Sequence, residues 1–188
     1  MKLLEDRIKK DGKIIGKDIL KVDSFINHQI DVFFLSELGK EFARLFRKEG
    51  VNKILTIEAS GIAIASITAF YFGCPVVFAK KSKSVNVGDD LYCTKVASFT
   101  HGGVNDVIVS KSYLGPNDRV LIIDDFLAEG NALIGLMDLC RQAGATVVGC
   151  GVLIEKAYQG GGDKVRQTCR VESLAKIAQM DENGIVFA

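Results

Sequence analysis

Short apolar segments alternate with helical patterns along most of this chain, and this alternation restricts the possible folds more than any other feature. The segments are almost continuously apolar, which is typical of strands buried on both faces. They occupy residues 53–58, 75–80, 107–109, 119–124, 146–155 and 171–178. Helical spacing of apolar residues is found at 35–46, 60–72 and 130–143. This order predicts an α/β fold with a central, mainly parallel sheet and helices on both of its faces.

Length and composition limit the class of protein. A chain of 188 residues favours a single domain, 1–188. The net charge of +1 gives no reason to expect nucleic acid or a membrane surface as the main partner. The first residues lack the apolar run of a signal peptide, and no segment has the apolar length of a membrane span. The five cysteines are widely spaced and form no C-x-x-C pair, so we expect reduced thiols in a cytoplasmic protein.

The segment VLIIDDFLAEGNA, residues 120–132, places two adjacent carboxylates where a strand is expected to end and a helix to begin. The first amides of a helix have no partner within it, and the helix dipole favours an anion there. Ala128 and Gly130 keep the loop slim, so a phosphate could rest on bare amides. Asp124 and Asp125 would repel that phosphate unless they accept hydrogen bonds from neighbouring hydroxyls or hold Mg²⁺. A sugar phosphate meets this requirement.

Each part of this segment also has a plainer explanation. A single aspartate at the end of a strand is often a helix cap or a solvated turn residue. The complete arrangement of strand, Asp pair, small-residue loop and helix favours a ligand site instead.

The same segment resembles the phosphoribosyl-pyrophosphate signature of the type I phosphoribosyltransferases. The similarity extends over nearly the whole chain and is closest to the bacterial purine-salvage members that use xanthine. It is carried by LKVDSFINHQID at 20–31, LTIEASGIA at 55–63, PVVFAKKSKS at 75–84 and VLIEKAYQ at 152–159. The resemblance implies the type I phosphoribosyltransferase fold with a small hood, formed mainly by residues 1–35 with C-terminal contributions. It also implies transfer of the 5-phosphoribosyl group from phosphoribosyl pyrophosphate to N9 of xanthine, giving xanthosine 5′-monophosphate and pyrophosphate.

In this family the two acidic residues of the signature face the ribose hydroxyls, so the resemblance implies this catalytic role for Asp124 and Asp125. The loop after them binds the 5-phosphate, which corresponds here to Ala128, Glu129, Gly130, Asn131 and Ala132. Many relatives have Thr or Ser in this loop, whereas this chain has Glu129 and Ala132. We therefore expect main-chain amides and Asn131 to bind the phosphate, and the Glu129 carboxylate to point away.

Two further segments resemble the pyrophosphate site of the family. EASG at 58–61 joins a strand end to a helix start, where amides would face the leaving group from Ala59, Ser60 and Gly61. A plain helix cap at Ser60 explains this segment about as well. Lys81 belongs to a lysine cluster that could neutralise pyrophosphate, although such clusters are usually solvated surface. We interpret residues 81–103 as a loop with some irregular strand, long enough to be a mobile functional segment.

The base site is expected around Lys156, which directly follows an apolar strand and should reach the same edge of the sheet. An ammonium only donates hydrogen bonds, which suits a purine with a 6-oxo group and disfavours adenine. The alternative is a lysine that simply leaves the strand into solvent. The resemblance adds Leu20 as an apolar wall and Asn27 as a donor to the 2-oxo group of xanthine. Phe25 and Phe126 could stack on the base, although phenylalanine is more often a core residue.

The resemblance also implies the cofactor and the assembly. Mg²⁺ would bind through the phosphates of phosphoribosyl pyrophosphate and water, without protein ligands. The protein would be a cytoplasmic homodimer. Two other functions stay open: a non-catalytic regulator that binds phosphoribosyl pyrophosphate, and a salvage enzyme that prefers hypoxanthine or guanine. Such a regulator usually carries a separate DNA-binding domain, for which this chain offers neither room nor basic surface.

Overall fold

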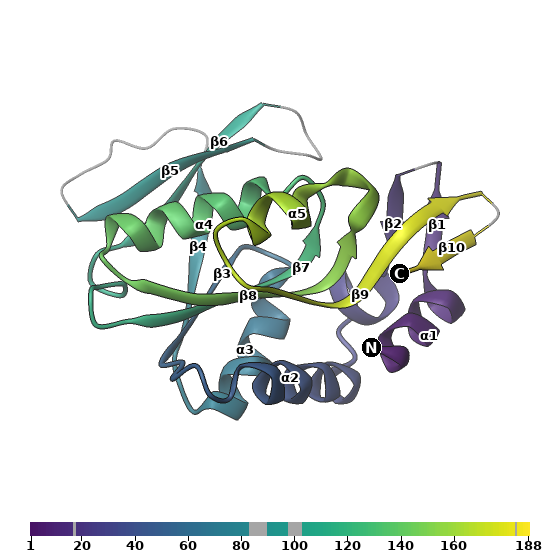
Figure 1. Cartoon of the computed structure of the whole chain (residues 1–188), viewed down its shortest axis with the longest axis horizontal. Helices are drawn as coiled ribbons and strands as arrows, with labels where there is room; N and C mark the ends of the chain where they lie inside the picture. Colours follow the sequence, from purple (N-terminus) through teal and green to yellow (C-terminus); the bar gives the residue numbers. More distant parts are fainter. Residues whose placement is uncertain (17, 83–89, 98–102, 183) are drawn as a thin grey trace.

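The computed structural model describes residues 1–16, 18–82, 90–97, 103–182 and 184–188 (Figure 1). These residues form an eight-stranded sheet flanked by helices, together with a small hood that has a two-stranded sheet of its own. Of the segment 81–103, which was expected to be a mobile loop, residues 83–89 and 98–102 lie outside the described part of the chain.

The large sheet runs in the order β10-β9-β8-β7-β3-β4-β6-β5. Its central strands are parallel to one another: β4 (Val76–Ser82), β3 (Lys53–Ile57), β7 (Arg119–Leu127), β8 (Thr146–Lys156) and β9 (Val171–Asp181). Both edges are antiparallel, and they consist of β10 (Gly184–Phe187) at one side and β6 (Val104–Ser110) with β5 (Leu91–Ala97) at the other. The predicted mainly parallel sheet is therefore confirmed.

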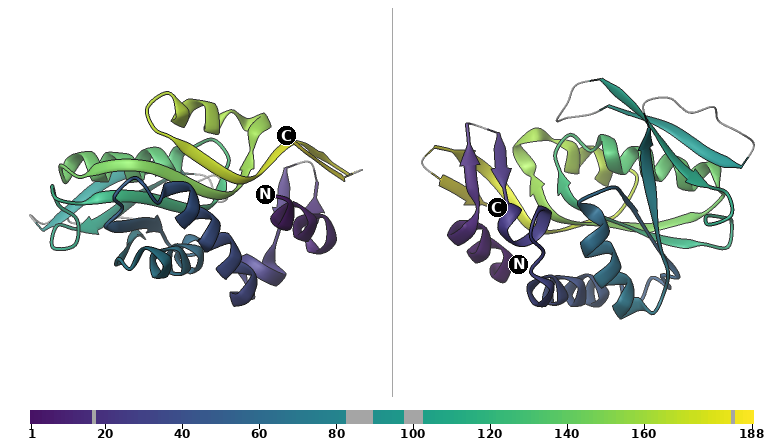
Figure 2. Two further views of the ribbon diagram at one scale, coloured as in Figure 1. Left: turned by 60° about the horizontal axis from the view of Figure 1, so that its bottom comes forward. Right: turned by 180° about the vertical axis from the view of Figure 1, so that it is seen from behind.

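Helices cover both faces of this sheet, also as predicted. One face carries α2 (Val32–Phe46) and α3 (Gly61–Phe72), and the other carries α4 (Asn131–Gln142) and α5 (Gly161–Arg166) (Figures 1 and 2). Alternate residues of β7 supply the two cores: Leu121 and Ile123 pack with α2 and α3, whereas Val120 and Ile122 pack with α4. All of these side chains are fully buried, which is the period-two pattern of a strand covered on both faces.

The hood is built from both ends of the chain. Its N-terminal part contains α1 (Lys2–Asp11), β1 (Lys13–Ile15), β2 (Ile19–Lys21) and the π-helical turn η1 (Asp23–Asn27). α1 packs on β9, where Leu4 and Ile8 share a core cluster with Leu174 and Ile177. Figure 2 shows β9 and β10 extending beside these N-terminal elements. The small hood implied by the resemblance is thus present.

The β5–β6 hairpin differs from the sequence prediction. Residues 91–97 were expected to be loop or irregular strand, but β5 pairs with β6 along its whole length, from Leu91 opposite Ser110 to Ala97 opposite Val104. The segment LYCTKVA mixes polar and apolar residues because it lies at the edge of the sheet and is covered mainly by α4. Such partial burial weakens the apolar signal that marks a central strand.

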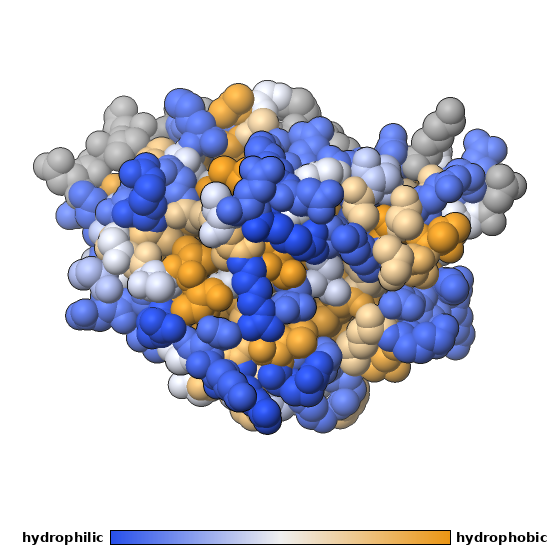
Figure 3. Space-filling view, in the orientation of Figure 1, coloured by the Kyte–Doolittle hydropathy of each residue, from blue (hydrophilic) through white to orange (hydrophobic). Residues whose placement is uncertain are grey.

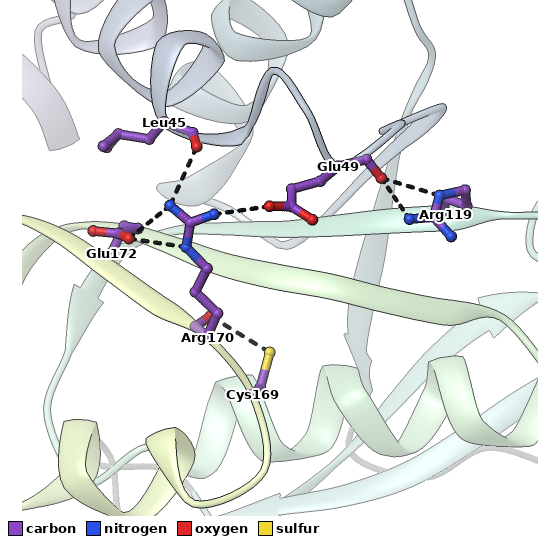
Figure 4. Close-up of polar contacts among 6 residues, drawn as sticks. All are labelled: Leu45, Glu49, Arg119, Cys169, Arg170 and Glu172. Carbon is purple, nitrogen blue, oxygen red and sulfur yellow. Dashed lines mark hydrogen bonds and ion pairs between the residues drawn. The ribbon is translucent and has the colours of Figure 1, made fainter.

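Arg170 fixes the amino-terminal ends of the strands to the end of α2 (Figure 4). Its guanidinium donates to the Leu45 carbonyl at 3.2 Å and to the Glu49 carboxylate at 3.0 Å, and Glu172 accepts from its Nε at 2.9 Å. The Glu49 carbonyl also accepts from Arg119 at the start of β7. These contacts lie at the edge of the sheet opposite to the one where β7 and β8 end, so they stabilise the scaffold and leave the other edge open.

The described helices, the surface and the cysteines resemble those of an ordinary globular protein. None of the described helices combines the length and the apolar character needed to cross a membrane. Hydrophilic and hydrophobic residues are interspersed on the face drawn in Figure 3. All five cysteines lie in the described part and are free thiols, and Cys140 and Cys150 are buried in the core.

Candidate active site

A cavity of about 460 Å³ opens between the carboxyl-terminal edge of the sheet and the hood. Ile57, Leu127 and Lys156 are the last residues of β3, β7 and β8, and all three line it. Leu20 and Asn27 line it from the hood. Ligands of open α/β sheets bind beyond the carboxyl ends of the strands, and this cavity is at that place.

Most residues predicted for the site lie together here. The cavity is lined by Leu20, Asn27, Ser60, Lys81, Asp125, the loop 128–132 and Lys156. Asp124, Ala59 and Gly61 are not among the lining residues. They are nevertheless neighbours of lining residues in the chain, since Ala59 and Gly61 flank Ser60 and Asp124 precedes Asp125. A Cβ added to Gly61 would come 2.9 Å from Oδ1 of Asp124.

The two aspartates have different environments. Asp125 lines the cavity, whereas Asp124 lies behind it, next to the start of α3. Oδ1 of Asp124 accepts the backbone N–H of Asp125 at 3.0 Å. Burial raises the pKa of Asp124 well above its usual range, the negative charge of Asp125 raises it further, and the Lys81 ammonium acts in the opposite direction. A ligand that brings hydroxyl donors or positive charge to this pair would therefore favour the ionised form of Asp124.

The backbone of the loop 128–132 is fixed by one left-handed glycine and by contacts with two helices. Gly130 precedes α4 with φ +85°, a left-handed conformation that favours glycine. The Ala128 carbonyl accepts the Gly161 amide at 3.1 Å, and the Gly130 carbonyl accepts the Ile134 amide at 3.0 Å. Because these carbonyls are engaged by α5 and α4, the loop is held from outside the cavity. The α4 dipole favours an anion at this end of the helix.

The side chains of the loop differ in part from the prediction. Asn131 was expected to assist in phosphate binding, but its Nδ2 donates to the Glu129 carboxylate at 3.0 Å. This hydrogen bond holds the Glu129 carboxylate beside the loop. Phosphate recognition by Asn131 stays a prediction, and this hydrogen bond uses only one of the two N–H groups of Nδ2.

Ser60 and Lys81 mark a second end of the cavity, at β3 and β4. Ser60 is the N-cap residue of α3, but its side chain makes no capping hydrogen bond, so a plain cap does not account for it. The Lys81 amide donates to the Glu58 carboxylate at 2.6 Å, which joins the ends of β3 and β4, and the Glu58–Ala59 peptide is cis. This end of the cavity thus combines a hydroxyl with an ammonium.

Lys156 does not leave the strand into solvent. The residue is 6% exposed, its Nζ donates to the Asp18 carbonyl in the hood, and it lies 5.8 Å from the centre of the Phe126 ring. Burial lowers the pKa of Lys156, and the Asp18 charge partly offsets this. Phe126 lines the cavity, as predicted for a stacking residue. Of the two alternatives for Phe25, the core role holds and stacking does not, because Phe25 is fully buried and packs edge-on against Phe34.

Sequence reasoning missed several lining residues, among which the polar side chains of Asp23 and Asn105 and the hood residue Ile19 are the most informative. Ile19 and Asp23 belong to the hood, close to the predicted Leu20 and Asn27, so the N-terminal block carried a partial signal. Asn105 lies on β6 and reaches the cavity only through the antiparallel pairing of β6 with β4. No local pattern reports such a pairing.

Comparisons with known proteins agree with this geometry. Residues 35–187 match the family model described as the phosphoribosyl transferase domain. The chain is 56% identical over 188 residues to a xanthine phosphoribosyltransferase of Lachnoclostridium phytofermentans, covering 99% of this chain and 97% of the relative. It is 50% identical over 188 residues to the xanthine phosphoribosyltransferase of Bacillus cereus strain AH187, covering 100% of this chain and 95% of the relative.

Solved structures support the fold. A Giardia lamblia adenine phosphoribosyltransferase complexed with 9-deazaadenine superposes with a TM-score of 0.79 at 24% identity, covering 92% of this chain and 97% of the other. The adenine phosphoribosyltransferase of Rhodothermus marinus gives a TM-score of 0.76 at 19% identity, covering 94% and 99%. At such identities the likeness concerns the fold alone.

Proposed function

The chain belongs to the phosphoribosyl transferase domain family, and from this premise we propose that it is a xanthine phosphoribosyltransferase. It transfers the 5-phosphoribosyl group from phosphoribosyl pyrophosphate to N9 of xanthine and releases xanthosine 5′-monophosphate and pyrophosphate. Relatives of this name match over essentially the full chain at 50–56% identity. The single observation that supports the base assignment is the buried ammonium of Lys156, which lies beside Phe126 at the rim of the cavity.

Xanthine would bind between the hood and β8. The Lys156 ammonium donates to the 6-oxo group, and it repels the amino group that adenine carries there, since both groups are donors. Asn27 donates to the 2-oxo group, Leu20 packs on the base, and Phe126 offers its ring for stacking. A site with a donor at each carbonyl discriminates against purines that lack one, because an unpaired buried group is costly.

Phosphoribosyl pyrophosphate would occupy the remainder of the cavity. Its 5-phosphate binds to the amides of Ala128, Glu129, Gly130, Asn131 and Ala132 at the start of α4. Asp125, supported by Asp124, accepts hydrogen bonds from the ribose 2′ and 3′ hydroxyls. Ser60 and Lys81, together with the backbone of Ala59 and Gly61, bind the pyrophosphate.

The reaction is a displacement at C1 of the ribose. N9 of xanthine forms the new bond while the bond from C1 to the pyrophosphate oxygen breaks, and the N9 proton passes to solvent or to the leaving group. The transition state has oxocarbenium character, so the negative charge of the Asp pair stabilises it. The protein mainly orients the two substrates, excludes water and balances charge on the pyrophosphate with Lys81.

Mg²⁺ fits this site as part of the substrate. Oxygen donors suit Mg²⁺, and Asp125 presents a carboxylate in the cavity. Among the described residues no cluster of three or more His, Cys, Asp or Glu side chains is arranged to hold a metal. As the resemblance implies, the phosphates and water would supply the ligands, and Mg²⁺ would neutralise charge on the leaving group.

The assembly and location follow the same reasoning. We infer that residues 1–188 act as a single domain, because the hood shares a core cluster with the large sheet. A homodimer is supported by large exposed side chains on α2 and α3, of which Phe33 is 89% and Phe70 81% exposed. Free thiols support a cytoplasmic location.

One assay tests the function. The protein, Mg²⁺ and phosphoribosyl pyrophosphate are mixed with xanthine, guanine, hypoxanthine or adenine, and pyrophosphate release is followed. Xanthine should give the highest kcat/KM. A preference for guanine or hypoxanthine would reassign the base, and the absence of turnover with all four bases would favour a regulator.

A further inference from the structure

The phosphate loop 128–132 rests on α5, a helix to which the proposed function assigns no role. We propose that Gly161, Glu155 and Arg166 form a brace that holds this loop in its phosphate-binding shape. The brace rests on the proposed function and extends it. Neither Glu155 nor Gly161 lines the cavity, so they are positioning residues.

Gly161 is the point at which α5 meets the loop. Its amide donates to the Ala128 carbonyl at 3.1 Å. A Cβ at Gly161 would come under 3.0 Å from three backbone atoms, the oxygen of Ala128, the carbonyl carbon of Glu129 and the nitrogen of Gly130. Backbone atoms cannot swing aside as side chains do, so any larger residue must displace the loop or the helix.

Glu155 fixes the other side of α5. Its carboxylate is 1% exposed and receives two parallel hydrogen bonds from the Arg166 guanidinium, at 2.8 and 2.6 Å, and a third from Ser173 at 2.5 Å. Burial by itself would raise the pKa of Glu155, but the hydrogen bonds from Arg166 and Ser173 outweigh it and lower the pKa. The Glu155 carboxylate also packs against Gly162, where a Cβ would come under 3.0 Å from Oε1.

These contacts connect the ion pair to the loop through α5. The helix has six residues, from Gly161 to Arg166, and a helix of this length does not hold itself in water. Arg166 at its end is bound to β8 through Glu155, and Gly161 at its start is bound to the loop. Val165, which lies in α5 between Gly161 and Arg166, is close to the loop. A Cβ added to Gly130 would lie 3.1 Å from Cγ2 of Val165. Loosening Glu155 therefore loosens the surface on which the loop rests.

Two variants with matched controls test the brace. Gly161→Ala inserts a methyl group between α5 and the loop. Gly115→Ala is its control, because a Cβ added to Gly115 has no neighbouring atom within 4 Å. Glu155→Gln removes the buried charge at constant volume, and Glu182→Gln makes the same change at an exposed position between β9 and β10. The readouts are the Kd of ribose 5-phosphate by calorimetry, the KM for each substrate, and the melting temperature.

Gly161→Ala and Glu155→Gln should raise the Kd of ribose 5-phosphate and the KM for phosphoribosyl pyrophosphate by roughly tenfold or more. The KM for xanthine should change less than about twofold. Both controls should match the wild type. Arg166→Lys, which keeps the charge but not the paired hydrogen bonds, should give an intermediate loss.

Equal increases in both KM values, or unchanged ribose 5-phosphate binding in folded Glu155→Gln, would overturn the brace. A wild type that binds no ribose 5-phosphate would overturn it too, because the loop would then not be a phosphate site. A wild type that binds ribose 5-phosphate but does not turn over xanthine would contradict the proposed function alone.

Discussion

Lys156 at the end of β8 donates from its ammonium to the main-chain carbonyl of Asp18, in the turn between β1 and β2. The hood therefore directly orients the side chain that we propose to bind the base. The hydrogen bond also gives the ammonium a partner inside a site that burial makes unfavourable for charge.

Lys156→Met should weaken base binding selectively. Methionine keeps most of the apolar stem but cannot donate, so the KM for xanthine should rise about tenfold or more, while the KM for phosphoribosyl pyrophosphate changes less than about twofold. Steady-state kinetics with each substrate varied in turn measures both values. Lys48→Met, at an exposed lysine after α2, is the control. Equal losses for the two substrates would remove Lys156 from the base site.

Asp125→Asn should slow turnover without unfolding the protein. The change removes a negative charge at nearly constant volume, so kcat should fall about 10²-fold while the melting temperature shifts by less than about 2 °C. Asp6→Asn on the exposed face of α1 serves as the matched control. If the variant loses its cooperative thermal transition instead, Asp125 is a structural residue.

Asp124→Asn should stabilise the ligand-free protein at neutral pH. The folded-state pKa of Asp124 is raised by burial and by the Asp125 charge, so its contribution to stability is fully present below the unfolded pKa and is lost as pH rises through the folded pKa. Asparagine does not ionise and retains an oxygen for the Asp125 amide. The melting temperature of the variant minus that of the wild type should therefore increase between about pH 4 and about pH 8. A difference that stays constant over this range would contradict the raised pKa.

Cys169 should be the first thiol to react with iodoacetamide at about pH 8, because the thiolate is the nucleophile. The Cys150 thiol, with its sulfur 3.8 Å away, lowers the pKa of Cys169 by hydrogen bonding. Burial raises the pKa of Cys140 to about 12, and burial also raises the pKa of Cys74 and Cys93. Peptide mass spectrometry over time gives the order of labelling, and Cys169→Ser should remove the fast phase. Faster labelling of Cys93 or Cys74 would disprove this order.

The parts of the fold with strong local signals were predictable from the sequence. β7 is covered on both faces, so VLII at 120–123 is apolar throughout and the strand could be recognised, although it continues past the expected end at Asp124 to Leu127. The loop 128–132 followed because small residues and a helix start lie next to one another in the chain. The cavity was therefore located from the sequence along one side, at the ends of β7 and β8.

The other side depends on contacts between distant segments. The hydrogen bond from Lys156 to Asp18 joins residues 138 positions apart, and Asn105 reaches the cavity through pairing at the sheet edge. The burial of Phe25 depends on Phe34 and on the neighbouring Arg7, whose guanidinium lies 5.0 Å from its ring. No periodicity within one segment reports such contacts, which is why the sequence left both a core role and a stacking role open for Phe25.

The dual origin of the hood has a consequence for synthesis of the protein. Leu4 and Ile8 leave the ribosome early, but the surface of β9 that covers them, with Leu174 and Ile177, is made among the last strands. A growing chain can complete β3, α3, β7 and α4 before β9, on which α1 packs, has been synthesised. The side of the cavity at the ends of β3 and β7 can thus form before the side that the hood provides.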